Sequence, residues 1–182
     1  MPNNIISFND LDTLFADFIQ EKLNLDADKV LISYQTRGKI APSMSDNVVY
    51  IHTEQDYEEH TQYKQRKEVY NSKTNKVDIY QETMRTLSLD IVFYGSQSAE
   101  LATLLNEIVY FDSSNQFFNN HNLSLVPDKT DLTLHVHEII NGQWWERCDL
   151  KLRFYNSIET VDAVNNIESV DVNMNGLEFI VS

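Results

Sequence analysis

The stretch Leu87-Ser88-Leu89-Asp90-Ile91-Val92-Phe93-Tyr94 alternates apolar and polar side chains. This alternation is typical of a β-strand with one buried face, here formed by Leu87, Leu89, Ile91 and Phe93. Gly95 ends the strand, and Ser96 or Ser98 can cap a following helix. The apolar stripe of that helix comprises Leu101, Leu104, Leu105, Ile108 and Val109. A strand followed by a helix indicates an α/β or α+β unit.

The residues before this strand predict one helix and two short strands. Ser7 and Asp10 resemble a capping box, and apolar residues then recur at helical spacing, so we expect a helix from Phe8 to Leu23. The apolar pattern shortens to strands at 29–34 and 48–53, with a loop containing Gly38 and Pro42 between them. We expect these two strands to pair.

The residues after the strand predict a short helix and a hairpin. Ser113 or Ser114 can cap a helix that ends near Asn119 and is anchored by Phe117 and Phe118. Alternating segments at 132–137 and 148–155 flank an Asn141-Gly142 turn signal, which indicates an antiparallel hairpin. Cys148 is expected to face the core in this hairpin.

Positive charge is concentrated in one polar stretch between residues 56 and 76. An Asn71-Ser72-Lys73-Thr74-Asn75 turn signal within it predicts two strands that extend past the core and join in a hairpin tip. A solvated loop and a partner-binding arm are equally compatible with this composition. The cations are Lys64, Arg66, Lys67, Lys73 and Lys76.

The C-terminal part of the chain is purely acidic, because no Lys or Arg follows Arg153. An Asn175-Gly176 signal predicts a last small hairpin, added to a sheet edge or lent to a neighbouring subunit. We expect a single α+β domain over residues 1–182, with 157–182 as an acidic hairpin or extension. Its sheet is expected to be mixed, mainly antiparallel, flanked by two or three helices, and to carry the extended basic hairpin.

Length and charge exclude several functional classes. The 182 residues carry a net charge of −14, which argues against binding to a phosphate backbone, and 42% hydrophobic residues indicate a folded body. A single cysteine cannot form an intrachain disulfide, so a reducing compartment is the simplest inference. We expect neither a signal peptide nor a membrane span, because no apolar run approaches about 20 residues.

Signatures of catalysis or cofactor binding are weak. The four glycines are too scattered for a phosphate or dinucleotide loop, and no serine or cysteine has the context of a nucleophile. His135 and His137 project to the same strand face, yet no third ligand stands at a recognisable spacing, so an exposed strand face is favoured over a metal site. We therefore expect no enzyme, cofactor or metal.

The segment Trp144-Trp145-Glu146-Arg147 is a candidate interface. Adjacent strand residues face opposite sides, so one indole can join the core while the other emerges beside Arg147. Equally, one tryptophan can cap the core edge while Glu146 and Arg147 are ordinary surface charges.

The order of these elements resembles the neck and tail terminator proteins of tailed bacteriophages. The similarity begins at the first helix and ends near Phe154, whereas the segment from Ser157 onward matches no part of the family pattern. It rests on the 87–95 strand and glycine, the helix from Ala99, the passage to Leu123-Ser124-Leu125, Asp131-Leu132-Thr133, and above all the strand Trp145-Glu146-Arg147-Cys148-Asp149-Leu150-Lys151-Leu152-Arg153-Phe154.

The resemblance implies a non-catalytic virion protein at the head–tail junction, assembled in the host cytoplasm into a ring of generally six copies. Such a ring stops growth of the tail tube and receives the head connector. The implied partners are other copies of the chain, the tail tube protein, a head-completion or connector protein and the tail sheath.

Two hypotheses connect this role to charge. The 64–76 arm would reach a neighbouring subunit or the tail tube, because a basic protrusion complements an acidic body. Acidic residues would line the lumen of the ring, so that DNA passes without specific binding. The competing classes are an acidic enzyme or metal protein, and a monomeric adaptor or nucleic-acid mimic that binds a basic host partner.

Overall fold

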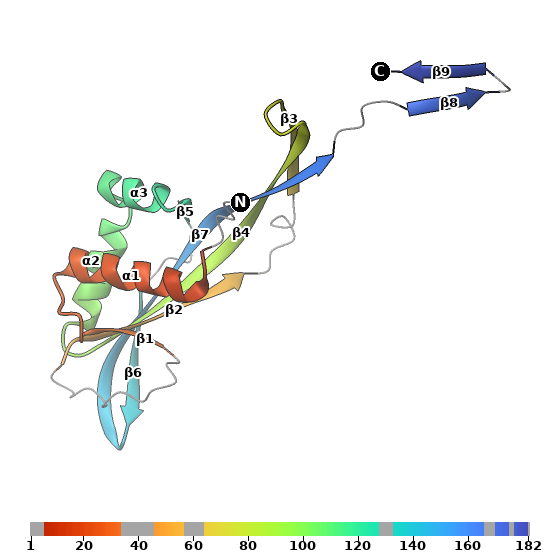
Figure 1. The fold of residues 1–182 in the computed structure, drawn as a ribbon. Coiled ribbons are helices and arrows are strands. Elements are labelled where there is room, and N and C mark those ends of the chain that lie inside the picture. The colour runs from red at the N-terminus through yellow and green to blue at the C-terminus, as the bar shows by residue number, and fades with distance from the viewer. Residues whose placement is uncertain are drawn as a thin grey trace.

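The computed structural model describes residues 6–33, 46–56, 64–127, 133–165, 170–174 and 177–181. Within these ranges the chain forms three helices and a seven-stranded sheet, with a separate two-stranded sheet near the C-terminus (Figure 1). The elements are α1 (Phe8–Leu23), β1 (Val30–Ile32), β2 (Val48–Asp56), β3 (Lys64–Asn71), β4 (Lys76–Tyr94), α2 (Ser98–Ile108), α3 (Asp112–Asn119), β5 (Leu123–Val126), β6 (Leu134–Ile140), β7 (Gln143–Asn165), β8 (Val170–Met174) and β9 (Leu177–Val181).

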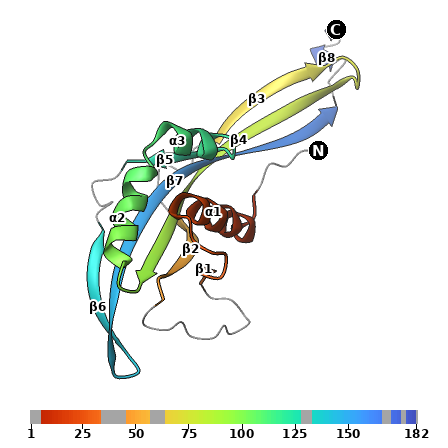
Figure 2. The ribbon, with the colours of Figure 1, turned by 90° about the vertical axis from the view of Figure 1, so that its left-hand side faces the viewer.

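The large sheet is mainly antiparallel and has the order β1-β2-β4-β7-β5. β3 also pairs with β4, and β6 also pairs with β7. β1 and β2 pair as expected, and their pairing is parallel. The helices lie together on one face of this sheet (Figure 2), so the predicted α+β class with a mixed, mainly antiparallel sheet is confirmed.

β4 is longer than the sequence predicts. The hairpin's returning strand and the 87–94 strand are one continuous strand of 19 residues, paired along its whole length with β7. No glycine or proline interrupts residues 76–94. The extended hairpin and the 87–94 strand, which the sequence predicts as separate features, therefore share one strand, because nothing local ends the extended backbone between them.

The core lies between the three helices and the sheet. The expected buried face of β4 is confirmed, with Leu87, Leu89, Ile91 and Phe93 at most 2% exposed. Phe154 of β7 contacts Phe15 of α1 and Phe118 of α3, with ring centroids 5.0 and 4.9 Å away. Cys148 is buried on this same helix-covered face, as predicted.

Helix α1 has the predicted boundaries and N-cap. Ser7 accepts a hydrogen bond from the backbone N–H of Asp10 at 3.2 Å, and the helix ends before Asn24, which has a left-handed φ of 51°. The buried Asp12 carboxylate accepts a hydrogen bond from the backbone N–H of Thr53 at 2.9 Å. This bond ties α1 to β2 just beyond the end of the β1 pairing.

The caps predicted for the other two helices are wrong. α2 begins after Gln97 and α3 after Phe111, and neither of these residues caps its helix through a side chain. Within the predicted α2 stripe, Leu104 is 48% exposed, whereas Ala102 is fully buried. The buried face of α2 is formed by Ser98, Ala102 and Leu105, which places Leu104 at the edge of that face rather than in the core.

Gly95 has a structural reason to be glycine. Its φ is 111°, and a Cβ at this position would lie 2.6 Å from the backbone oxygen of Asp46. The glycine therefore permits the sharp turn from β4 into α2 and a close approach to the segment before β2.

The sheet extends beyond the helices at both ends (Figure 2). At one end β3 and residues 76–84 and 157–165 form a three-stranded ribbon, named the arm below. At the other end β6 and the start of β7 form a hairpin with positive φ angles at Asn141 and Gly142, as the turn signal predicts. The structure thus confirms the projecting hairpin and adds β7 as its third strand.

β8 and β9 pair with each other in the separate two-stranded sheet, so the predicted C-terminal hairpin is confirmed. Its Asn175-Gly176 turn, and the loop with Gly38 and Pro42, lie outside the described residues.

Candidate functional site

The arm brings the five predicted cations into one extension. Lys64, Arg66 and Lys67 lie along β3, Lys73 lies in the turn, and Lys76 begins β4, all of them exposed. Arg66 is ion-paired with Glu68 of the same strand at 2.7 Å.

The arm as a whole is not cationic. Its three strands and turn contain five acids as well as five cations. Four of the acids lie in β4 and β7, outside the cationic stretch 64–76 of the sequence. The charges are separated across its width, with a cationic outer strand β3 and a purely acidic outer strand at 157–165. The acids of the arm are Glu68, Asp78, Glu82, Glu159 and Asp162.

The β6–β7 hairpin presents an exposed apolar pair. Trp144 is 64% exposed, and its cross-strand neighbour Ile139 is 57% exposed. By strand alternation both side chains lie on the helix-covered face of the sheet, beyond the buried Cys148. Because tryptophan combines a large apolar area with little conformational freedom, this pair is suited to a protein contact.

Trp145 occupies the opposite face of the sheet and is half-buried. Its ring meets that of Tyr94 edge-on, with centroids 6.1 Å apart and an interplanar angle of 87°. One indole does emerge as the sequence suggests, but the other packs on the opposite face rather than in the core. Of the two alternatives that the sequence leaves open, the one in which an indole joins the core does not describe Trp145, because the core faces the even-numbered residues of β7.

Arg147 is held within the subunit, whereas Glu146 is exposed. The Arg147 guanidinium donates to Asp149 at 2.7 Å and to Glu138 at 3.1 Å, and the Tyr94 hydroxyl donates to Glu138 at 2.8 Å. Hydrogen bonds from Tyr94 and Arg147 lower the pKa of Glu138. Burial, together with the bond to Glu138, raises the pKa of Tyr94 to about 12. This network orients the base of the hairpin.

The ion pairs continue along the same face of β7. Lys151 lies between Asp90 and Glu54, at 3.3 and 3.7 Å, and Arg153 pairs with Asp56 at 3.0 Å. Each partly exposed pair contributes modestly to stability, and the row links side chains of the neighbouring strands β2, β4 and β7. Sequence reasoning missed these pairs, because alternating polar residues reveal the face but not which strands are neighbours.

A second network that sequence reasoning missed lies at the base of the arm. Arg85 is only 8% exposed and donates to the Asn156 side chain at 2.7 Å and to the Ile6 carbonyl at 2.9 Å. Asn156 in turn donates to the Asn122 carbonyl at 2.9 Å. Burial lowers the pKa of Arg85, and its guanidinium also lies over the Phe8 ring. These contacts anchor the arm to the helical part of the domain.

His135 and His137 lie side by side on β6, with ring centroids 4.9 Å apart. Among the described residues, no group of three or more His, Cys, Asp or Glu side chains is arranged to hold a metal. Both histidines are exposed on the strand face that carries Ile139. Burial raises the pKa of the Cys148 thiol, which favours its unreactive form.

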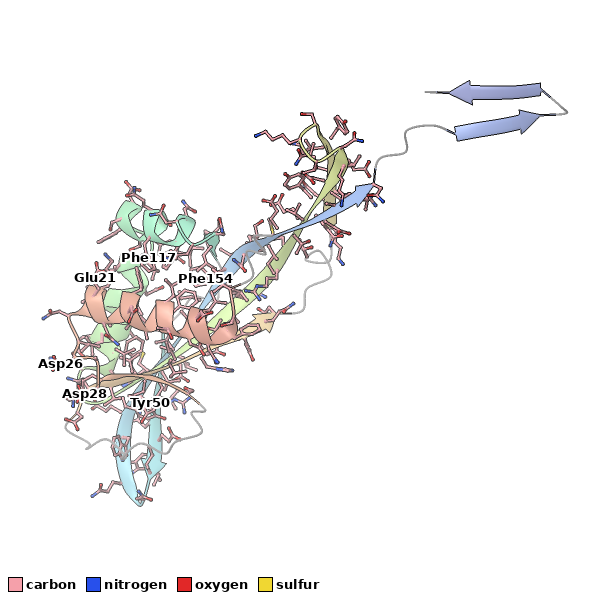
Figure 3. The ribbon with its side chains drawn as sticks, viewed as in Figure 1. Glu21, Asp26, Asp28, Tyr50, Phe117 and Phe154 are labelled. Atoms are coloured by element: carbon pink, nitrogen blue, oxygen red, sulfur yellow. The ribbon has the colours of Figure 1, made fainter. Side chains whose placement is uncertain are left out.

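Figure 3 shows how the side chains are distributed, with Phe154 between the helices and the sheet, Phe117 between α3 and α1, and Asp26 and Asp28 on the turn after α1. These features define a class of small α+β protein in which β-extensions at both ends of one sheet display aromatic and charged side chains. Over the described part of the chain, no helix is both long and apolar enough to cross a membrane.

The chain belongs to a family of phage neck terminator proteins, whose model matches residues 9–178. A search of curated proteins found no match. The matched range includes the acidic segment from Ser157 onward, so the expectation that this segment stands outside the family pattern is wrong. The arm's third strand and β8 fall within the family region, which ends at residue 178, just after β9 begins.

Membership in this family gives the chain a structural role at the neck of a bacteriophage virion. Such a role brings it into contact with other proteins of the tail or head, and the family is generally non-enzymatic.

Proposed function

We propose that this protein forms a ring, generally of six copies, which ends the tail tube and receives the head connector. The observation that carries the proposal is the family match over residues 9–178. A ring at such a position must present one surface to its neighbours and others to the proteins above and below it. The two β-extensions supply separate surfaces of this kind.

In this proposal the arm, through Lys64, Arg66, Lys67, Lys73 and Lys76, contacts another copy or the tail tube. The hairpin around Trp144 provides the other contact, with the tube or connector protein. Trp145, Glu146 and Arg147 support that contact, since the ion pairs of Arg147 orient the strand that carries Trp144. Both surfaces combine apolar area with charge, as protein interfaces do.

The net charge of −14 supports a further part of the proposal, in which acidic side chains line the lumen. Like charge keeps the phosphate backbone from adhering, so DNA passes without specific binding. The tail sheath is a further partner where the tail has one, and the ring assembles in the host cytoplasm before it enters the virion.

The test is gold-labelled antibody against this protein on intact virions, viewed by electron microscopy. Label confined to the head–tail junction is the expected result, and averaging of labelled necks gives the copy number. Label absent from intact and disrupted particles, with the protein present only in infected-cell lysate, would overturn the proposal and favour the acidic adaptor.

A further inference from the structure

The two outer edges of the arm are unpaired among the described strands. β3 pairs with β4 alone, and β7 pairs with β4 alone after β5 ends opposite Arg153–Asn156. An exposed edge strand offers a row of backbone N–H and C=O groups to any extended segment of suitable charge.

The hydrogen bonds show which backbone groups of β7 face outward. The odd-numbered Ser157 faces away from β4, because its N–H donates to the Asn122 carbonyl at 3.4 Å. The even-numbered Glu146 faces toward β4, because its carbonyl accepts from the N–H of Gly95, just after β4, at 3.2 Å. Because these directions alternate along a strand, odd-numbered residues of β7 turn their backbone groups to the outer edge. Glu159 and Val161 therefore present theirs outward, while the Ala163 N–H is met by the Asp162 carboxylate at 2.9 Å.

The two edges carry opposite charge. β3 contains three cations against Glu68, whereas residues 157–165 contain Glu159 and Asp162 and no cation. Opposite charges on neighbouring strands stabilise a sheet, and like charges directly opposite destabilise it. The basic edge of one arm is thus complementary to the acidic edge of another.

Strand direction and length also agree. β3 and β7 are both antiparallel to β4, so they run in the same direction. Rotation about an axis along the arms preserves this direction, so β3 of one copy meets β7 of the next as a parallel pair. The 8 residues of β3 and the nine residues 157–165 are of similar length.

We propose that the β3 edge of each copy adds to the 157–165 edge of its neighbour, so that the arms join into one continuous sheet around the ring. This inference rests on the proposed ring and specifies how its subunits connect. The contact joins two different edges of identical chains, and such a heterologous contact closes into a ring when the rotation permits. Within one arm, Arg66 lies level with Thr160 and Lys67 level with Val161. If β3 of one copy is shifted by two residues along β7 of its neighbour, Arg66 lies opposite Asp162 for a shift in one direction, and Lys67 lies opposite Glu159 for a shift in the other.

The test reverses each edge separately and then both together. One variant carries Arg66→Glu and Lys67→Glu, a second carries Glu159→Lys and Asp162→Lys, and a third carries all four changes. Each is supplied from a plasmid to a phage lacking this gene, and infectious particles are counted. Asp26→Lys with Asp28→Lys, on the exposed turn after α1, makes the same change in net charge as the second variant and is its matched control.

Each single-edge variant should lower the yield at least about tenfold, because acid then faces acid or base faces base. The four-change variant should recover most of the yield, since it restores opposite charges with the polarity exchanged. The control should resemble wild type, and circular dichroism should show all variants folded, since the arm lies outside the core.

Wild-type yield from both single-edge variants would overturn the inference and assign the β3 cations to protection of an edge against aggregation. Absence of rescue in the folded four-change variant would also overturn it. Neither result changes where the gold-labelled antibody binds on wild-type virions. If that antibody binds wild-type virions somewhere other than the neck, the proposed function itself is overturned.

Discussion

Replacing Trp144 with alanine separates the role of the β6–β7 hairpin in assembly from its role in folding. Trp144 is 64% exposed, and a tryptophan can bury about 150–250 Å². A partner can therefore cover about 100–160 Å² more, which corresponds to about 2.5–4 kcal/mol at about 25 cal/mol per Å². The area already buried accounts for at most about 1–2 kcal/mol of folding stability by the same conversion.

The expected result is a folded variant that assembles poorly. A loss of 2.5 kcal/mol weakens a contact about sixtyfold. Unfolding in urea measures the change in stability, and complementation of a phage lacking the gene measures assembly. Trp144→Phe should retain much of the assembly, and Gln143→Ala, an exposed neighbour on the same strand, serves as the control.

The reasoning fails if Trp144→Ala complements as well as wild type. It fails equally if the variant loses more than about 3 kcal/mol of stability, because the side chain would then be part of the core despite its exposure.

Three further predictions concern the fold. Asp12→Ala should cost about 1.5–3 kcal/mol in urea unfolding because the buried Thr53 amide loses a charged acceptor; Asp12→Asn should cost less, and equal losses would contradict the role of this bond. Leu89→Ala, in the core at 2% exposure, should cost about 2–5 kcal/mol, and a loss below about 1 kcal/mol would refute its placement. Since the folded pKa of Tyr94 is raised from 10.0 to about 12, its contribution to stability is present below pH 10 and lost as pH rises toward 12. Tyr94→Phe should flatten this alkaline decline in unfolding free energy, while an unchanged slope would show that other groups cause it.

Local patterns predicted the elements that depend on local physics. The helix Phe8–Leu23 has the boundaries expected from its apolar spacing and from the Ser7 cap. The Asn141-Gly142 turn and the buried face of β4 were also predicted, because positive φ and period-two alternation depend on short stretches of chain. The mixed α+β class and the family resemblance, both confirmed, followed from the order of these elements.

Features that depend on which strands become neighbours could not be predicted in the same way. The third strand of the arm comes from residues 157–165, about ninety residues from β3 in the sequence, so the balance of its charges was hidden. The pairing of Arg153 with Asp56 depends likewise on the register of β7 against β4 and β2. The strand alternation predicted that Trp144 and Trp145 face opposite sides of the sheet, but it could not predict which of these two sides the helices cover.

The uninterrupted pairing of β4 with β7 has a mechanical consequence. β7 runs for 23 residues, about 75 Å at about 3.3 Å per residue, from the Trp144 hairpin to the end of the arm. A pull applied to β7 at the Trp144 hairpin and to β4 at the turn of the arm acts along the strands, so the hydrogen bonds across 19 paired positions are loaded in shear and must yield together. The domain can thus transmit tension between its two β-extensions through backbone hydrogen bonds, without passing that load through the helices.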